Sequence, residues 1–170
     1  MPSYAPMTSK RWLIALSTLV VMLTIAGAVS FVGYVRRHAP QPTLVAVAPF
    51  DIFVPGLELW RVRLAQELTA RLDSSPPLTA VSQDVVRERW RGQKQPEVAA
   101  VDLARRTSAG IAVYGRLDPF ASTSDSVLVR MMVIAAGTGR VLSFMNVRWP
   151  RALLPDLARA LARHVQQNYR

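Results

Sequence analysis

The residues that could perform chemistry are few in this 170-residue chain, and they lie far apart. Its two histidines are His38 and His164, and it contains no cysteine. A chain without cysteine has no disulfide, thiolate nucleophile or thiolate metal ligand. An active site needs an acid, a base or a nucleophile held within reach of one another. The sequence has neither a serine–histidine–aspartate arrangement with its supporting motif nor a cluster with metal-ligand spacing. We therefore expect no catalytic, cofactor-binding or metal-binding residues.

The acidic candidates have simpler structural explanations. Asp51 follows a predicted strand, a place where parallel sheets bind ligands, but a loop or turn aspartate is the simpler interpretation. A hydrolase that uses Asp51 and a bound metal is the enzymatic alternative. Asp84 and Glu88 lie one helical turn apart and could share a cation, yet arginines surround them, which favours a solvated charged face.

The remaining polar motifs are also interpreted structurally. His164 lies near the end of the last predicted helix, where a cation suits the helix dipole. Residues 137–139 read Gly-Thr-Gly but lie in a predicted hairpin turn. A phosphate-binding glycine loop would instead precede a helix.

The net charge of +10, from 21 basic and 11 acidic residues, does not indicate a nucleic-acid binder. The basic residues are scattered, and no aromatic residues alternate with them to provide a stacking surface. A solvated basic surface with a weak attraction to anionic membranes is the expected consequence.

One segment, Trp12–Val35, predicts a transmembrane helix. It contains no charged residue and is flanked by Lys10–Arg11 and Arg36–Arg37. As a helix it would span roughly 36 Å, enough to cross a hydrocarbon core of about 30 Å. Trp12 and Tyr34 stand at its ends, where aromatic side chains favour the membrane interface. The lipid bilayer is therefore a predicted partner.

A cleaved signal peptide is the alternative, with Ala26-Gly27-Ala28 as the cleavage site. The apolar run continues beyond Ala28, which favours an uncleaved anchor. The short basic N-terminus is expected to stay in the cytoplasm, which places the rest of the chain outside it. Small residues at Ala26 and Ser30 give only a weak signal for helix dimerisation, so the oligomeric state is not predicted.

We expect four segments: a tail (1–11), the transmembrane helix (12–35), a linker (36–42) and one domain (43–170). Within the domain, apolar and β-branched runs predict strands, and apolar residues three or four apart predict helices. The strands are Thr43–Phe50, Leu78–Val81, Ile111–Leu117, Ser126–Ala136 and Val141–Trp149. The helices are Gly56–Ser74, Gln83–Arg91, Glu97–Ala109 and Leu153–Asn168, with Ser82 and Gly110 as end signals.

The order β-α-β-α-α-β-β-β-α predicts an α/β fold with a mixed five-stranded sheet and packed helices. Strands joined by helical crossovers are expected to be parallel, and the last strands are expected to form an antiparallel meander.

Three strings together resemble the TolB-like amino-terminal domain, which is related to FlgO-type and CsgG-type envelope domains. They are VAVAPF at Val45–Phe50, IAVYGRL at Ile111–Leu117 and GTGRVLSF at Gly137–Phe144. The family's serine-capped helix and its strand ending near tryptophan correspond to Ser82 and Trp149. The family commonly has aspartate before the hairpin turn, whereas this chain has alanines at 135 and 136.

The resemblance implies a protein-interaction or scaffolding module of the bacterial cell envelope, without catalytic residues. With the predicted anchor, it implies a single-pass inner-membrane protein whose domain lies in the periplasm and binds another envelope protein. The alternative is a sensor domain for a small ligand, held in a pocket between the sheet and the helices.

Overall fold

The computed structural model describes residues 40–92, 95–120 and 125–169, and Pro40–Arg170 forms one compact unit. The predicted transmembrane segment Trp12–Val35 lies outside the described residues. Within the described ranges, no helix is both long enough and apolar enough to cross a membrane.

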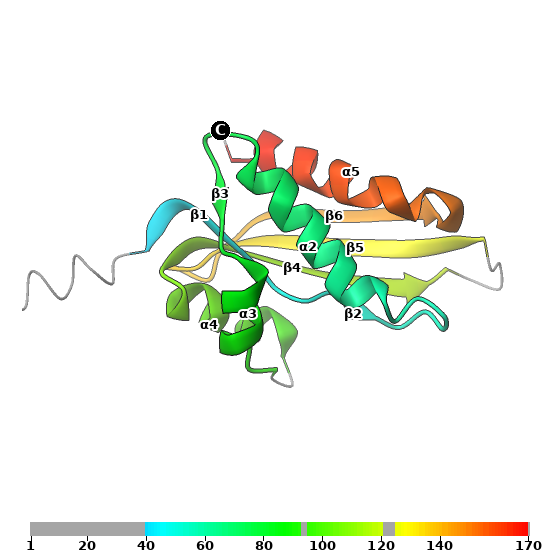
Figure 1. The fold of residues 1–170 in the computed structure, drawn as a ribbon, viewed down its shortest axis with the longest axis horizontal. Coiled ribbons are helices and arrows are strands. Elements are labelled where there is room, and N and C mark those ends of the chain that lie inside the picture. Colours follow the sequence, from blue (N-terminus) through cyan, green and yellow to red (C-terminus); the bar gives the residue numbers. More distant parts are fainter. Residues whose placement is uncertain (1–39, 93–94, 121–124, 170) are drawn as a thin grey trace, which may run out of the picture. The chain divides into compact units, whose positions relative to one another are not determined.

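A six-stranded mixed sheet forms the centre of this unit (Figure 1). The spatial order is β3-β1-β4-β5-β6, and the short β2 pairs with β4 beyond the end of β1. The pairs β1–β3, β1–β4 and β2–β4 are parallel, whereas β4–β5 and β5–β6 are antiparallel. The strands are β1 (Gln41–Val47), β2 (Asp51–Ile52), β3 (Thr79–Ala80), β4 (Ala109–Pro119), β5 (Ser126–Ala135) and β6 (Val141–Pro150).

Helices pack on both faces of the sheet. On one face, α2 (Trp60–Asp73) lies beside α5 (Leu154–Gln167), which follows a short 3-10 turn, η1 (Arg151–Leu153). On the other face lie α3 (Gln83–Arg89) and α4 (Pro96–Arg106). Figure 1 shows this separation, with α2 and α5 on one side of the strands and α3 and α4 on the other.

The larger core lies between the sheet and the pair α2–α5. The predicted stripe of α2 is buried, with Leu64, Leu68 and Leu72 fully enclosed, and α5 buries its leucines at 154, 157 and 161 in the same core. The smaller core, under α3 and α4, is built mainly from alanines, which allow these helices to approach the sheet closely. Helical spacing of apolar residues therefore identified both packed faces of the larger core.

The mixed α/β sheet is confirmed, but the predicted number of five strands is wrong because β2 is present. Asp51, expected in a loop after the first strand, instead begins β2 and pairs with Arg116 of β4. The chain leaves β1 at Val47 and passes through Pro49, which cannot donate to the sheet ladder. It then returns to the sheet for only two residues, too few to give an alternating pattern.

Some predicted helix ends were also wrong. Gly110, expected to end the third helix, lies inside β4, and the positive φ of 57° falls on Ser108 instead. The first helix begins at Trp60 rather than Gly56, because Gly56 adopts a turn with φ of +79° and donates its N–H to the Glu58 carboxylate. Val98, an apolar residue of the predicted helix Glu97–Ala109, is 49% exposed. Ser82 does precede α3, but its side chain makes no capping hydrogen bond.

Candidate functional site

Part of one sheet face has no helix over it among the described residues, and we call this surface the open face. It comprises the side chains of β4, β5 and β6 that point away from α5. Figure 1 shows α3 and α4 beside one end of the sheet, whereas β4, β5 and β6 extend beyond them. On the edge strand β6, the exposed positions alternate with half-buried ones. The exposed side chains include Leu142, Phe144, Asn146 and Arg148.

The antiparallel register places the open-face residues in rows across the three strands. Tyr114 pairs with Met132, which pairs with Phe144. In the next row Arg116 pairs with Arg130, which pairs with Asn146. Together with Glu97 from the start of α4, these two rows line a hollow of about 400 Å³. The hollow combines an apolar row with a row of hydrogen-bond donors.

Asp118 holds the two arginines of the second row. Its carboxylate accepts two hydrogen bonds from Arg116, at 2.8 Å from Nε and 2.6 Å from Nη2. It also lies 3.6 Å from Nε of Arg130. Like charges directly opposite each other on a sheet are destabilising, and the shared carboxylate offsets that repulsion. The hydrogen bond to Asp118 raises the pKa of Arg116 above its ordinary value.

Arg130 is less fully satisfied than Arg116. Its Nε is buried and has no hydrogen-bond partner among the described residues, because the carboxylate of Asp118 is too distant for one. The side chain as a whole is 41% exposed. Arg130 therefore combines a buried Nε that has no partner among the described residues with a side chain that is partly exposed at the open face.

Tyr114 and Asp51 form the boundary between the open face and the core under α4. The Tyr114 hydroxyl donates to Oδ2 of Asp51 over 3.0 Å. Burial, and then the hydrogen bond to Asp51, raise the pKa of Tyr114 above its ordinary value, so the phenol stays protonated at neutral pH. Phe53, 57% exposed, stacks against the guanidinium of Arg116 at 5.2 Å. Asp51 is thus held by the phenol of Tyr114.

The other residues considered from the sequence are dispersed. Asp84 lies 3.6 Å from Arg87 in an exposed ion pair. His164 on α5 hydrogen-bonds the Ser143 hydroxyl of β6 over 2.6 Å, and so links helix to strand. His38 lies outside the described residues. Within the described ranges, no three histidine, aspartate or glutamate side chains group closely enough to hold a metal ion.

The Gly-Thr-Gly turn has the hairpin geometry that its glycines predict. Gly139 adopts φ of +70°. Its N–H donates to the Ala135 carbonyl over 2.7 Å, and the Thr138 hydroxyl accepts from the Arg140 N–H over 3.3 Å. The Thr138 side chain therefore bonds to the backbone of the turn.

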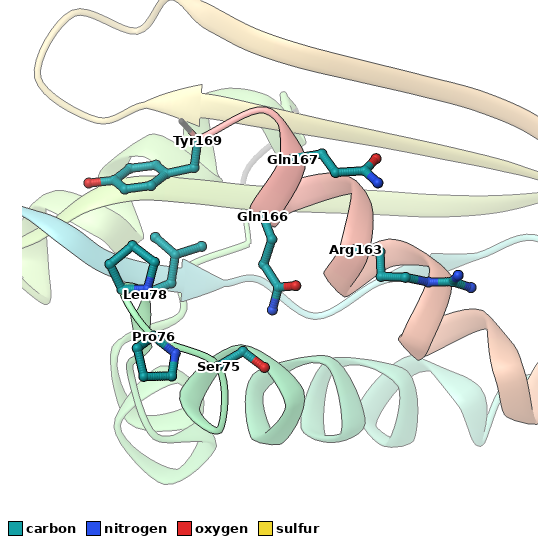
Figure 2. A pocket seen from close by; sticks show the side chains of 8 residues that line it. Ser75, Pro76, Leu78, Arg163, Gln166, Gln167 and Tyr169 are labelled. Carbon is teal, nitrogen blue, oxygen red and sulfur yellow. The ribbon is translucent and has the colours of Figure 1, made fainter.

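A second hollow, of about 310 Å³, lies where the end of α5 faces the loop between α2 and β3 (Figure 2). Figure 2 shows Arg163 and Gln166 on α5, with the ring of Tyr169 beyond the helix end and Pro76 and Leu78 on the loop. The lining combines apolar rings with amide and guanidinium donors. It is another place in the described part of the chain where a small molecule could bind.

The sequence identified only part of the open face. Arg130 is the one charged residue of the predicted strand Ser126–Ala136. Phe144 and Asn146 were missed, although they occupy alternate positions of the predicted strand Val141–Trp149. Their exposure depends on which part of the sheet face α4 leaves uncovered. The alternation of residues along a strand does not give this information.

No family model and no curated protein matches the chain. Solved structures with a similar fold include three bacterial proteins. TolB from Acinetobacter baumannii matches with a TM-score of 0.52 at 16% identity, over 77% of this chain and 29% of TolB. The C-terminal domain of LpoB from Salmonella enterica matches at 0.53 and 13% identity, over 66% of this chain and 86% of that one. Lipoprotein GNA1162 from Neisseria meningitidis matches at 0.53 and 14% identity, over 74% and 97%.

At these identities the likeness establishes the fold alone. This chain covers less than a third of TolB, so the comparison with TolB concerns one part of that protein. The resemblance to TolB is confirmed at the level of fold, and the relation to FlgO-type and CsgG-type domains stays a prediction. The domain at Pro40–Arg170 has the α/β fold shared by TolB, the LpoB C-terminal domain and GNA1162.

Proposed function

We propose that this chain is a membrane-anchored protein of the bacterial cell envelope, and that its domain binds another envelope protein through the open face. The proposed anchor is Trp12–Val35, with the domain on the periplasmic side of the inner membrane. The observation that carries the binding role is the open face. It exposes Phe144 by 53% next to guanidinium groups held in place by a carboxylate.

The composition of the open face suits protein binding. Aromatic residues and arginine are enriched at protein interfaces, and they contribute much of the binding energy there. Phe53 and Phe144 provide exposed aromatic area, and Arg116 and Arg130 provide donors. Arg116 is already held by Asp118, so little side-chain entropy remains to be lost there on binding.

The anchor receives indirect support from the comparisons. GNA1162, which has a similar fold, is named a lipoprotein. This chain has no cysteine, so a lipid linked to cysteine is excluded. An apolar helix would attach the domain to the bilayer in its place.

We propose further that the protein is not an enzyme. Two of the three acids at the hollow are engaged, Asp51 by the Tyr114 phenol and Asp118 by two guanidinium groups, and Glu97 is the third. An activity screen of the full-length protein and the Asp51→Asn variant tests this. A reproducible activity that Asp51→Asn abolishes would establish catalysis.

A small-ligand sensor is the second candidate, and the hollow in Figure 2 is the observation that favours it. Arg163, Gln166 and Tyr169 could hold a ligand against the α2–β3 loop. A ligand that raises the melting temperature of the native chain, but not of the Arg163→Ala variant, would support this role.

Site-directed change of the open face tests the binding role. Full-length protein is extracted from membranes with its partners, as wild type, as Phe144→Asp and as Leu59→Asp. Leu59 is 89% exposed at the start of α2, away from the open face, and serves as the matched control. We expect Phe144→Asp to lose the co-purifying partner and Leu59→Asp to retain it. Equal retention by both variants would refute the open face as the binding surface.

A further inference from the structure

One end of the domain carries a group of exposed arginines, which we call the basic end. Here β1 and β4 begin, α3 and α4 end, and the β5–β6 turn lies. Three different segments contribute to it: the end of α3 with the residues after it, the last turn of α4, and the hairpin turn. All its arginines are exposed, and they are Arg89, Arg91, Arg105, Arg106 and Arg140.

Hydrogen bonds hold these segments together. Gln41 donates its N–H to the Ser108 carbonyl over 2.8 Å, which ties the start of β1 to the segment after α4. Nε of Arg105 donates to the Ala136 carbonyl over 3.1 Å, which ties α4 to the hairpin. Arg89 donates to the carbonyl of Arg106. The basic end is therefore fixed by the fold rather than by mobile side chains alone.

The acids near this cluster do not neutralise it. Asp102 pairs with Arg106 at 2.8 Å, and Glu88 lines a shallow hollow with Arg89, Arg91 and Arg106. Five arginines against two carboxylates leave a charge of +3 (5 − 2). Helix dipoles explain cations at the ends of α3 and α4. They do not explain Arg91, which follows the end of α3, or Arg140, which lies in a hairpin.

The chain also enters the domain at this end. Strand β1 begins at Gln41, and the apolar run of the sequence ends at Val35. Residues 36–40 can span at most about 18 Å when fully extended, and they include Arg36 and Arg37. A domain tethered so closely to a bilayer would bring its point of attachment, and hence the basic end, near the lipid headgroups.

We propose that the basic end binds the anionic phospholipid headgroups of the membrane that holds the anchor. This inference rests on the anchor proposed above. Arginines near an anionic surface are attracted over about one Debye length, some 8–10 Å at physiological salt. Such binding would orient the domain on the membrane, where the tether alone would leave it free to rotate.

The test uses the full-length protein in lipid nanodiscs. The chain lacks cysteine, so Gly92→Cys gives a single site for a fluorescent label beside Arg91. Among the described residues, the atom nearest to a Cβ added at Gly92 is Nε1 of Trp90, at 3.9 Å. Energy transfer to acceptor lipids is measured in phosphatidylcholine discs with and without phosphatidylglycerol. We expect phosphatidylglycerol to increase the transfer and added salt to reverse the increase.

Two triple variants that remove the same charge test whether the response to phosphatidylglycerol depends on the basic end. Arg91→Gln, Arg106→Gln and Arg140→Gln together remove three charges from the basic end. The control removes three charges from the first halves of α2 and α5, on other elements than those of the basic end, and consists of Arg61→Gln, Arg63→Gln and Arg159→Gln. We expect the first variant to abolish the phosphatidylglycerol response and the second to retain it. An equal response in both variants would overturn the proposal.

Carbonate extraction of cell membranes tests separately whether Trp12–Val35 anchors the protein in the bilayer. Protein that resists extraction but shows no phosphatidylglycerol response refutes the lipid contact and leaves the anchor intact. Protein that is extracted, yet responds to phosphatidylglycerol through the basic end, refutes the anchor and supports the lipid contact.

Discussion

Gly115 of β4 is a position where a single methyl group should disrupt the core. A Cβ at this residue would lie 2.1 Å from Cε1, 2.6 Å from Cδ1 and 2.8 Å from Cζ of Phe50. Contacts this short do not occur between real atoms, so Gly115→Ala must displace the ring or the strand. Phe50 is fully buried in the larger core and has no path to solvent. The packing therefore requires glycine at position 115.

The size of the effect follows from two limits. Inserting a methyl group into a well-packed core costs about 1–3 kcal/mol. Complete loss of the packing of a buried phenylalanine costs about 3–5 kcal/mol. Because the overlap exceeds 1 Å, we expect Gly115→Ala to cost about 2–4 kcal/mol of unfolding free energy. Without the clash the sign would reverse, since alanine is favoured over glycine in a strand by roughly 0.5–1 kcal/mol.

Urea unfolding of the unit Pro40–Arg170 measures this cost, with Gly137→Ala as the control. Gly137 has no atom within 4 Å of an added Cβ, so its substitution should change stability by less than about 0.5 kcal/mol. In the Phe50→Ala background the clash disappears, and Gly115→Ala should then cost little. A neutral or stabilising Gly115→Ala in the wild-type background would refute the packing argument.

Three further predictions concern the core, the pH dependence and the anchor. Leu64→Ala and Leu68→Ala, both at fully buried positions, should each cost about 2–5 kcal/mol in the same urea assay. The raised pKa of Tyr114 means that its phenol stabilises the fold at neutral pH, and that this stabilisation is lost as the pH rises above about 10. Tyr114→Phe should therefore flatten the fall in stability measured above about pH 10, and an unchanged slope would contradict the assignment. Full-length protein should resist carbonate extraction and keep its N-terminus, whereas sequencing that begins at Val29 would establish cleavage of a signal peptide.

The helices and strands with a periodic apolar pattern could be predicted from the sequence, because each of them buries one face. The leucines of α2 recur at helical spacing, and the structure buries Leu64, Leu68 and Leu72. The strands β4, β5 and β6 were found from their apolar runs, and the glycine-rich turn placed the β5–β6 hairpin correctly. These signals are local, so they do not require knowledge of the packing.

The remaining features depend on tertiary packing. The two residues of β2 form a strand because β4 extends beyond β1 and leaves an edge free for pairing. Phe144 is exposed because, within the described ranges, the short α3 and α4 cover one end of this sheet face only. The bond between Tyr114 and Asp51 joins residues that are 63 positions apart. The two partners of such a contact are too far apart in the sequence for a local pattern to reveal them. The arrangement of the open face is therefore known only from the folded structure.

The hollow of the open face and the arginines at the end of α4 lie at opposite ends of that helix, so the two proposed contacts are compatible. Glu97 at the start of α4 borders the hollow of the open face, and Arg106 at its end belongs to the basic end. At about 1.5 Å per residue, the nine-residue separation places them roughly 14 Å apart along the helix. A domain that rests on the membrane by its basic end would hold the open face above the headgroups, with the strands rising away from the bilayer. A partner could then reach Phe144 from the side without displacing lipid. Loss of lipid binding should therefore weaken partner binding only through orientation, whereas Phe144→Asp should abolish it directly.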